Sequence, residues 1–416
     1  MRRYESYKDS GVEWLGEVPS HWNLIPNKYI FKLRKNVVGK RSNEYDLLSL
    51  SLKGVIKRDM ENPEGKFPAE FDTYQEVKEG DFIFCLFDVE ETPRTVGLSS
   101  YRGMITGAYT IFETNNVDKK FIYYFYLNLD SDKRLKPLYK GLRNTISKET
   151  FFSFNTFIPP LSEQQKIAQF LDDKTAKIDQ AVDLAEKQIA LLKEHKQILI
   201  QNAVTRGLNP DEPLKDSGVE WIGQVPEHWE VKKLKFVLTL SNKKEESKNS
   251  NKRYIGMENI ESFTGKINDI PLIAEGIANS FYKDEILFGK LRPYLAKSYL
   301  ADFDGICSTE FLVYRSTKVL NNRFALNIFL SYGFIDAVNA STYGSKMPRA
   351  NAEFISNMFL AIPPLSEQQQ IADYLDKQTA KIDQAIALKI AHIEKLKEYK
   401  SVLINDVVTG KVRVSV

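Results

Sequence analysis

The stretch IPPLSEQQKIAQFLDDKTAKIDQA, residues 158–181, returns as IPPLSEQQQIADYLDKQTAKIDQA at residues 362–385. A second stretch, KDSGVEWLGEVPSHW at residues 8–22, recurs as KDSGVEWIGQVPEHW at residues 215–229. The later copies lie 204 and 207 residues after the earlier ones. Because both spacings are nearly equal, the chain consists of two similar units that follow each other head to tail. We call the shorter repeated stretches the preambles.

Each longer stretch predicts the start of a long helix. Pro-Pro fixes the entry, and we expect Ser162 and Ser366 as N-caps, with Gln165 and Gln369 as the reciprocal partners of a capping box. Apolar residues then step alternately by four and three, the heptad pattern of a coiled coil. We expect the seam of the coiled coil, and with it the docking surface for partners, to contain Leu171, Ile178, Val182, Ile189, Leu192, Leu375, Ile382, Ile386, Ile393 and Leu396.

Lys196 and Lys400 occupy matching positions in the two seams. A polar residue at such a position can specify the register of a coiled coil. A lysine near the end of a seam can also extend its ammonium group to water, and we favour this interpretation. A helix over residues 163–204 would span roughly 60 Å at about 1.5 Å per residue, so we expect the helices to act as spacers.

The composition predicts an ordinary globular protein with more than one domain, since 43% of the 416 residues are hydrophobic. A net charge of +3 permits contact with a polyanion without requiring it. Cys85 and Cys307 lack metal-binding spacing, which favours a reducing cytoplasm and argues against a zinc site. No apolar run is long enough to cross a membrane, and no nucleotide-binding, metalloprotease or hydrolase motif occurs. We therefore expect neither catalysis nor membrane association.

Residues 23–157 and 230–361, between preamble and helix, differ between the units. Strands are predicted at residues 45–52, 81–87 and 105–112 with a helix at 119–129, and at residues 253–260, 285–288 and 306–314 with a helix at 323–332. Each copy is thus an α+β domain with a common plan and different side chains. We divide the chain into a first domain with its preamble (1–157), a first coiled-coil helix (158–206), a linker with the second preamble and domain (207–361), and a second helix with the C-terminal tail (362–416).

Both variable domains end in a basic, glycine-containing segment, KGLRNTI at residues 140–146 and YGSKMPR at residues 343–349. Glycine lets the backbone approach a partner, and Arg, Lys, Asn and Ser can contact phosphates and base edges. One such segment alone is more often a solvated loop, but the matched positions favour DNA binding. Basic and aromatic residues between two predicted strands form a second candidate group, for which a charged hairpin is an equal alternative. The candidate DNA-binding residues are Arg94, Arg102, Lys140, Arg143, Asn144, Thr145, Lys290, Arg292, Tyr294, Lys297, Ser345, Lys346 and Arg349.

Two similar units in one chain bury their seams most simply by packing the helices antiparallel about a pseudo-two-fold axis. We expect this arrangement to separate the variable domains, each of which would read a different half of an asymmetric DNA site. The helices would set the length of the unread spacer.

The paired PPLSEQQ helix starts, the EW(L/I)GxVPxHW preambles and the alternation of repeated and variable regions resemble the specificity subunits of type I restriction-modification systems over essentially the whole chain. The resemblance implies two target-recognition domains, two coiled-coil helices and no catalytic activity in this chain. It also implies assembly on double-stranded DNA with two methyltransferase subunits that use S-adenosylmethionine to methylate adenine. Two endonuclease-translocase subunits, which would bind ATP and Mg²⁺, would complete the complex.

Two alternatives remain open from the residues. A coiled-coil scaffold that binds protein only would show no salt-dependent affinity for duplex DNA. A restriction enzyme with its own fused methyltransferase is opposed by the absence of nucleotide-binding and amino-methylating motifs.

Overall fold

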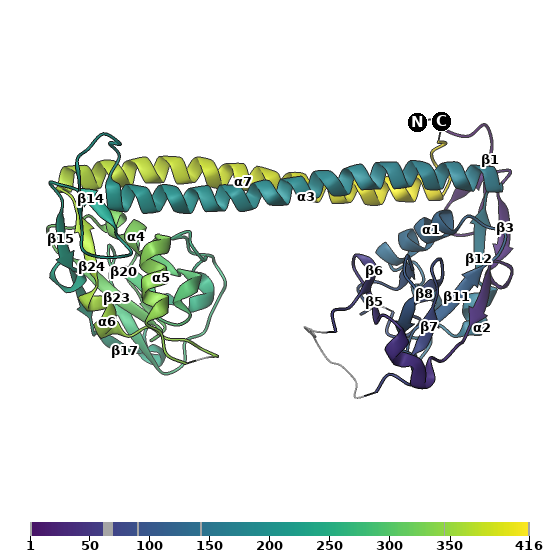
Figure 1. The fold of residues 1–416 in the computed structure, drawn as a ribbon, viewed down its shortest axis with the longest axis horizontal. Helices are drawn as coiled ribbons and strands as arrows, with labels where there is room; N and C mark the ends of the chain where they lie inside the picture. Colours follow the sequence, from purple (N-terminus) through teal and green to yellow (C-terminus); the bar gives the residue numbers. More distant parts are fainter. Residues whose placement is uncertain (1, 61–69, 90, 142–143, 345, 415–416) are drawn as a thin grey trace. The chain divides into compact units, whose positions relative to one another are not determined.

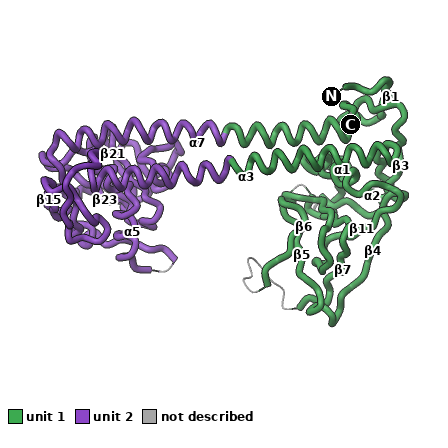
Figure 2. The backbone as a smooth tube through the Cα atoms, turned by 45° about the horizontal axis from the view of Figure 1, so that its top comes forward, with its two compact units in different colours: residues 1–184, 391–416 green, residues 185–390 purple. Residues whose placement is uncertain are grey.

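The computed structural model describes residues 2–60, 70–89, 91–141, 144–344 and 346–414. It forms two compact units (Figure 2): unit 1 contains residues 1–184 and 391–416, and unit 2 contains residues 185–390. Each unit holds one preamble, one variable domain and part of both long helices, α3 (Leu161–Arg206) and α7 (Leu365–Val408). The predicted α+β class and the two long helices are confirmed, although the boundary between the compact units falls inside the helices.

Each variable domain is built on a four-stranded antiparallel sheet with the same strand order. In unit 1 the order is β4 (Phe31–Arg34), β11 (Thr110–Thr114), β8 (Phe82–Phe84) and β9 (Val96–Leu98). In unit 2 it is β16 (Leu238–Ser241), β23 (Phe311–Ser316), β20 (Ile286–Gly289) and β21 (Ser298–Leu300). Figure 1 labels the two inner strands of each sheet, β8 and β11 in unit 1 and β20 and β23 in unit 2. The common plan predicted for the two domains is therefore present in their central sheets.

A second sheet is complete in unit 2 and fragmentary in unit 1. In unit 2 its order is β17 (Lys244–Glu246), β19 (Ile277–Phe281), β22 (Gly305–Cys307) and β18 (Tyr254–Ile255), with β18 parallel to β22. In unit 1 only β7 (Gln75–Val77) and β10 (Gly103–Ile105) pair among the described residues, and isolated bridges replace the outer strands. The hairpin of β5 (Leu48–Ser51) and β6 (Gly54–Lys57) stands beside this sheet.

One helix in each unit packs between the central sheet and a long helix. These are α1 (Lys119–Ser131), capped by Asp118, and α4 (Asn322–Leu330), capped by Asn321. In unit 1, Phe121 of α1 shares a fully buried core with Leu171 of α3 and Val407 of α7. Hydrophobic burial thus ties both long helices to the variable domain.

Shorter elements complete the two units. They are β1 (Tyr7–Asp9), β2 (Glu17–Pro19), β3 (Asn23–Pro26), α2 (Lys148–Ser153) and β12 (Asn155–Ile158) in unit 1, and β13 (Leu214–Asp216), β14 (Gln224–Pro226), β15 (Glu230–Lys233), α5 (Tyr332–Ala340), α6 (Ala352–Asn357) and β24 (Phe359–Ile362) in unit 2. In both units the strand before the long helix pairs antiparallel with the strand after the preamble.

Several predicted elements were too long. The strand predicted over 253–260, for example, corresponds to β18 alone, and a 3₁₀ turn follows at Met257–Asn259. Residues 105–112 and 306–314 each divide into two strands, because the chain turns at Thr106 and Ser308 and passes from the second sheet to the central one. An apolar run records burial and does not show which sheet buries it. The helix predicted over 323–332 ends at Leu330, and α5 begins as a separate helix after Ser331.

The long helices run antiparallel in unit 2, where Gln188 contacts Lys389 and Lys196 contacts Asp383. Residue numbers that rise along α3 therefore meet numbers that fall along α7. A left-handed glycine follows each helix, Gly207 with φ 75° and Gly410 with φ 74°, the usual conformation at a helix C-terminus.

The two chain termini meet in unit 1 (Figure 1). The Arg413 amide donates to the Arg2 carbonyl at 2.8 Å, and the Tyr7 hydroxyl donates to the Gly410 carbonyl at 3.1 Å. In unit 2 the segment after α3 instead continues directly into the second preamble. The same junction is thus covalent in unit 2 and non-covalent in unit 1. Among the described residues, no helix combines the length and the apolarity that crossing a membrane would need.

Candidate nucleic-acid interface

Two loops of unit 2 that the sequence singled out lie against each other. Residues 290–297 connect β20 with β21, and residues 343–349 follow α5. The Ala350 amide donates to the Lys290 carbonyl at 2.9 Å, immediately beside the backbone pairing that closes the second loop. The two loops therefore form one surface, which we call the unit 2 loop pair.

Arg292 occupies a strained corner of this surface. Its backbone is left-handed, with φ 50° and ψ 63°, although Pro293 follows it. The Arg292 amide donates to the Pro348 carbonyl at 2.7 Å, and its carbonyl accepts from the Leu295 amide at 2.9 Å. A left-handed residue other than glycine costs about 1–2 kcal/mol. The packing of the loop pair holds the corner in this conformation, with the Arg292 side chain exposed.

Cations and aromatic rings are exposed around this corner. Tyr294 is 45% exposed and Tyr343 is 65% exposed. Within the described part of the chain, the side chains of Lys290, Arg292 and Lys346 have no hydrogen bond or ion pair. Free cations beside exposed rings can contact phosphates and stack on bases. Ser345 lies outside the described residues.

Two other candidate residues of unit 2 have partners inside the protein. The Arg349 guanidinium donates three hydrogen bonds of 3.0–3.2 Å to the Glu310 carboxylate, and these bonds raise the pKa of Arg349. The Lys297 ammonium donates to the Met257 carbonyl at 2.6 Å, and burial lowers the pKa of Lys297. The geometry gives both residues a positioning role in the loops.

The corresponding segment of unit 1 is closed by backbone hydrogen bonds between its described residues. Lys140 and Thr145 exchange backbone hydrogen bonds of 2.9 and 3.1 Å. Gly141 and Asn144 have positive φ angles of 73° and 45°, which glycine and asparagine tolerate better than other residues. Lys140 is exposed. Arg143 lies outside the described residues.

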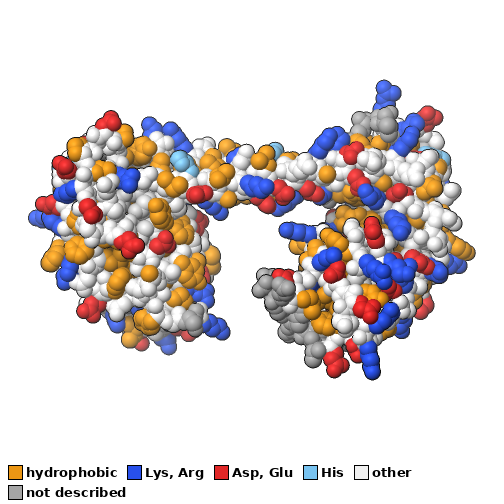
Figure 3. All heavy atoms as spheres, viewed as in Figure 1, with side chains coloured by type: hydrophobic (Ala, Val, Ile, Leu, Met, Phe, Trp, Pro, Cys, Tyr) orange, Lys and Arg blue, Asp and Glu red, His pale blue; other side chains and the backbone are white. Residues whose placement is uncertain are grey.

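The two remaining arginine candidates of unit 1 contact neighbouring loops. Arg94 donates to the Leu52 carbonyl at 2.9 Å. Arg102 lies over the ring of Tyr45, 6.0 Å from its centroid, and 3.8 Å from Glu76. With 73% of its side chain exposed, Arg102 remains accessible to a ligand. Figure 3 shows Lys and Arg side chains mixed with Asp and Glu over the face in view, so no uniform basic field marks the interface there.

The repeat spacing of 204 residues reveals a residue that sequence reasoning missed. The Ile146 amide donates to the Leu86 carbonyl at 2.8 Å, and both residues lie 204 positions before the equivalent pair in unit 2. The same spacing makes Asp88 of unit 1 the equivalent of Arg292, and the backbone of Asp88 is also left-handed, with φ 45°. The two corners thus share a backbone conformation and carry opposite charges. Aligning the repeats through the variable domains would have identified Asp88.

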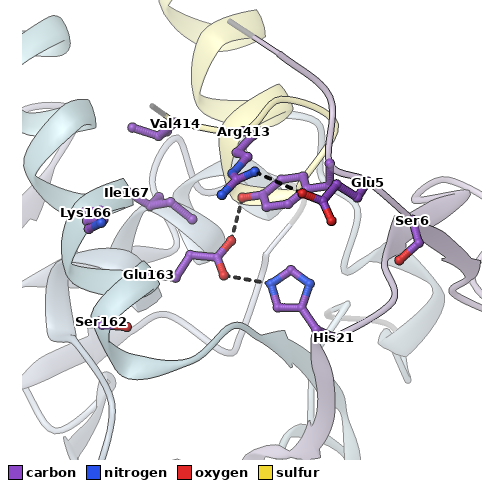
Figure 4. A pocket seen from close by; sticks show the side chains of 10 residues that line it. Glu5, Ser6, His21, Ser162, Glu163, Lys166, Ile167, Arg413 and Val414 are labelled. Carbon is purple, nitrogen blue, oxygen red and sulfur yellow. Dashed lines mark hydrogen bonds and ion pairs between the residues drawn. The ribbon is translucent and has the colours of Figure 1, made fainter. Parts of the chain in front are cut away.

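A carboxylate at the start of each long helix anchors the preamble. In unit 1, Glu163 accepts from the indole of Trp22 at 3.2 Å. Figure 4 shows the second contact of this carboxylate, 2.8 Å from the ring nitrogen of His21. Tyr4 also donates to Glu163, at 2.5 Å, and burial together with this bond raises the pKa of Tyr4.

Unit 2 repeats this anchor. Glu367 accepts from Trp229 at 3.1 Å and lies 2.8 Å from His228. The histidines of the preambles are therefore part of the anchors, and the two tryptophans are almost completely buried.

The predicted capping boxes are wrong. The Pro160 carbonyl accepts the first helical hydrogen bonds of α3, from Glu163 and Gln164, so Pro160 is the N-cap and Ser162 lies inside the helix. Gln164 is buried and accepts from the Asp118 amide at 2.8 Å. The second copy repeats this arrangement around Pro364. The polar residues of the motif satisfy neighbouring segments of the domain, because the tertiary fold brings those segments to the helix start.

The predicted seam residues lie between the helices to different degrees. Five are buried: Leu171, Ile178, Leu375, Ile382 and Ile393. Five are half-buried: Val182, Ile189, Leu192, Ile386 and Leu396. None of the ten is exposed.

The seam lysines form ion pairs across the helix pair. Lys196 lies 2.7 Å from Asp383, and Lys400 lies 2.6 Å from Asp179, and the repeat spacing exchanges these two pairs. Lys196 is only 7% exposed, so the interpretation that it extends to water is wrong. Burial would raise the pKa of Asp383, but hydrogen bonds from Lys196 and Lys266 outweigh it and lower that pKa.

The cysteines and acidic groups offer no metal chemistry among the described residues, which contain no group of three or more His, Cys, Asp or Glu side chains placed to hold an ion. Cys85 and Cys307 are free and buried. Burial raises the pKa of both thiols, that of Cys307 to about 12.

A family model for the type I restriction modification DNA specificity domain matches residues 100–193 and 226–395, more than half of the chain. The chain belongs to the type I specificity subunits. It contains two matches, one in each repeat.

Three curated relatives that the chain matches are also named as type I specificity subunits. The chain is 25% identical over 258 residues to the Escherichia coli EcoDI specificity subunit, covering 57% of this chain and 58% of that one. It is 25% identical to the MjaVIII specificity subunit of Methanocaldococcus jannaschii over 75% of each chain, and 23% identical to the putative MjaX specificity subunit of that organism over 99% and 97%. The match thus spans little more than half of the E. coli subunit and nearly all of the MjaX subunit.

Solved structures share the fold of this chain. A chain from a study of the assembly and conformational transition of a type I system has a TM-score of 0.69 at 11% identity, with 95% of this chain and 99% of that chain covered. The HsdS subunit of Thermoanaerobacter tengcongensis has a TM-score of 0.53 at 12% identity, with 95% and 98% covered.

Proposed function

We propose that this specificity subunit selects an asymmetric, two-part DNA site. Each variable domain reads one half-site in the major groove, and the long helices set the length of the spacer. The observation that carries the proposal is the contrast inside the repeat. Each unit has its own central sheet, helix anchor and paired helices, and these are built in the same way in both units. The matched loops, in contrast, carry different side chains. Such a design holds the geometry constant and lets the two readings differ.

The proposed contacts divide into two chemical kinds. Exposed cations such as Lys140 and Lys346 neutralise phosphates, which provides affinity without sequence information. Arginine and acidic or amide side chains at the loop corners meet base edges, which provides sequence preference.

The helices supply the proposed docking surface for methyltransferase subunits. In unit 2, Leu191 is 63% exposed and Leu388 is 66% exposed, and Ile198 and Ile390 are 45% and 50% exposed. These residues lie outside the seam, whose members pack within the helix pair, so they are better docking candidates than the seam itself. Apolar side chains exposed on a helix favour burial against a partner.

We propose a complex with two methyltransferase and two endonuclease-translocase subunits on double-stranded DNA. S-adenosylmethionine, ATP and Mg²⁺ would bind to those partners, and this chain would take no part in the chemistry.

The test is to co-express the chain with its methyltransferase subunit in cells without adenine methylation and to map N6-methyladenine across the genome. A two-part asymmetric motif with a fixed gap is the expected result. The scaffold alternative predicts that a verified soluble complex produces no motif. Duplex binding that does not weaken with salt would also contradict the proposal.

A further inference from the structure

The loop that follows the third strand of each central sheet (β8 and β20) turns at one left-handed residue, Asp88 in unit 1 and Arg292 in unit 2. The hydrogen bond between Ile146 and Leu86, and its equivalent between Ala350 and Lys290, fix both loops to the segment before the long helix. Two domains with different side chains therefore present one residue at the same structural position.

The conformation at this position favours glycine, yet both units place a charged side chain there. Arginine gains nothing locally from a left-handed backbone before proline. Within the described residues, neither the Asp88 carboxylate nor the Arg292 guanidinium has a hydrogen bond or ion pair. A strained backbone that presents a charged group without an intramolecular partner is typical of a position that binds a ligand.

The surroundings of Arg292 separate its role from that of neighbouring cations. Arg349, on the adjacent loop, is neutralised by Glu310, and Lys297 is bound to a backbone carbonyl. Lys290 and Lys346 flank the corner as point charges suited to phosphates. The Arg292 guanidinium is planar and can donate two parallel hydrogen bonds, as the O6 and N7 atoms of guanine require.

Resting on the proposed function, we infer that the left-handed corner is a base-reading position in both domains. Arg292 binds a guanine in the half-site of the second domain. Asp88 accepts a hydrogen bond from the exocyclic amino group of cytosine in the half-site of the first domain. The two half-sites therefore differ at structurally matched positions because the corner residue differs in charge.

The experiment uses Arg292→Gly and Asp88→Gly in the complete complex with the methyltransferase subunit. Glycine removes the side chain and also relieves the left-handed strain, so loss of folding is not expected. Thermal unfolding of each variant should match or exceed that of the wild type. Arg292→Lys keeps the charge and loses the paired donors, which provides a second test of the same contact.

Methylation mapping gives the readout. Arg292→Gly should reduce the preference for one guanine of one half-site by roughly 10- to 100-fold, with the other half-site and the spacer unchanged. Asp88→Gly should reduce the preference for one cytosine in the other half-site. As a matched control, Lys346→Ala should lower methylation at every site and leave the motif unchanged.

An unchanged motif with Arg292→Gly and Arg292→Lys would overturn the inference, and so would relaxation in both half-sites by either single variant. These results require a wild-type complex that yields a two-part motif. A wild-type complex without any motif would instead overturn the proposed function, so the two failures are distinguishable.

Discussion

When the two units are compared, the starts of their long helices are alike, whereas the corners of their loops carry different side chains. At the helix starts, Glu163 and Glu367 make the same contacts to tryptophan and histidine, with distances that agree within 0.1 Å. At the loop corners, Asp88 and Arg292 share a backbone conformation and oppose each other in charge. The repeated residues hold each domain on its helices, and the variable residues change what the domain presents.

The largest expected effect comes from removing a preamble tryptophan. Trp22→Ala should destabilise unit 1 by about 3–5 kcal/mol, because removing a fully buried indole leaves a cavity and takes one hydrogen bond from Glu163. Amide hydrogen exchange should show faster exchange in the core of unit 1. Trp229→Ala should produce the same loss in unit 2. A large effect in one unit and none in the other would break the equivalence of the anchors.

The ion pairs of the two seam lysines differ in burial, so removing each lysine should lower the stability of the chain by a different amount. Lys196→Met should destabilise the chain by about 1–3 kcal/mol, because it removes a cation from a largely buried pair. Lys400→Met should cost less than about 1 kcal/mol, since its partner Asp179 is 58% exposed. Urea denaturation of the two variants measures the difference. Equal losses would show that burial does not distinguish the two pairs.

The Arg349–Glu310 pair tests whether the loop pair needs internal support. Arg349→Ala should weaken DNA binding by about 3- to 10-fold at low salt, because it leaves the Glu310 carboxylate unpaired beside the proposed phosphate contacts. Adding Glu310→Ala should restore most of the affinity, as measured by fluorescence anisotropy with a duplex that contains the mapped site. Failure of the second change to restore binding would indicate that Arg349 contacts DNA directly.

The smallest expected effect is a pH dependence of stability that comes from Asp383, the partner of Lys196 and Lys266. Its folded pKa lies below the unfolded value of about 3.9. Its stabilising contribution is therefore fully present above about pH 4 and is lost as the pH falls through the folded pKa. Asp383→Asn should flatten the acid limb of the stability profile of unit 2. An acid limb as steep as that of the wild type would exclude Asp383 as a contributor.

The sequence predicted the long helices well, the strands in part and the contacts between elements poorly. Heptad spacing identified both long helices, and apolar runs marked β8, β11, β20 and β23 of the central sheets. The sequence did not indicate the other four central strands, β4, β9, β16 and β21. It did not show that Arg349 pairs with Glu310, 39 residues away, or that Lys297 binds Met257, 40 residues away. The sequence could not distinguish Lys and Arg side chains that are exposed from those that have partners inside the protein, because a side chain's partners depend on packing.

The duplication, the helix periodicity and the α+β order of each domain can be identified from the amino-acid sequence, since they follow from local spacing and from repeated segments. Four features required the folded structure: Pro160 caps α3, Glu163 anchors the preamble, Lys196 is buried in an ion pair, and two separated loops of unit 2 form one surface. Each of these depends on groups far apart in the chain, which meet because burying the apolar faces of sheet and helix leaves one arrangement in which their polar groups are satisfied.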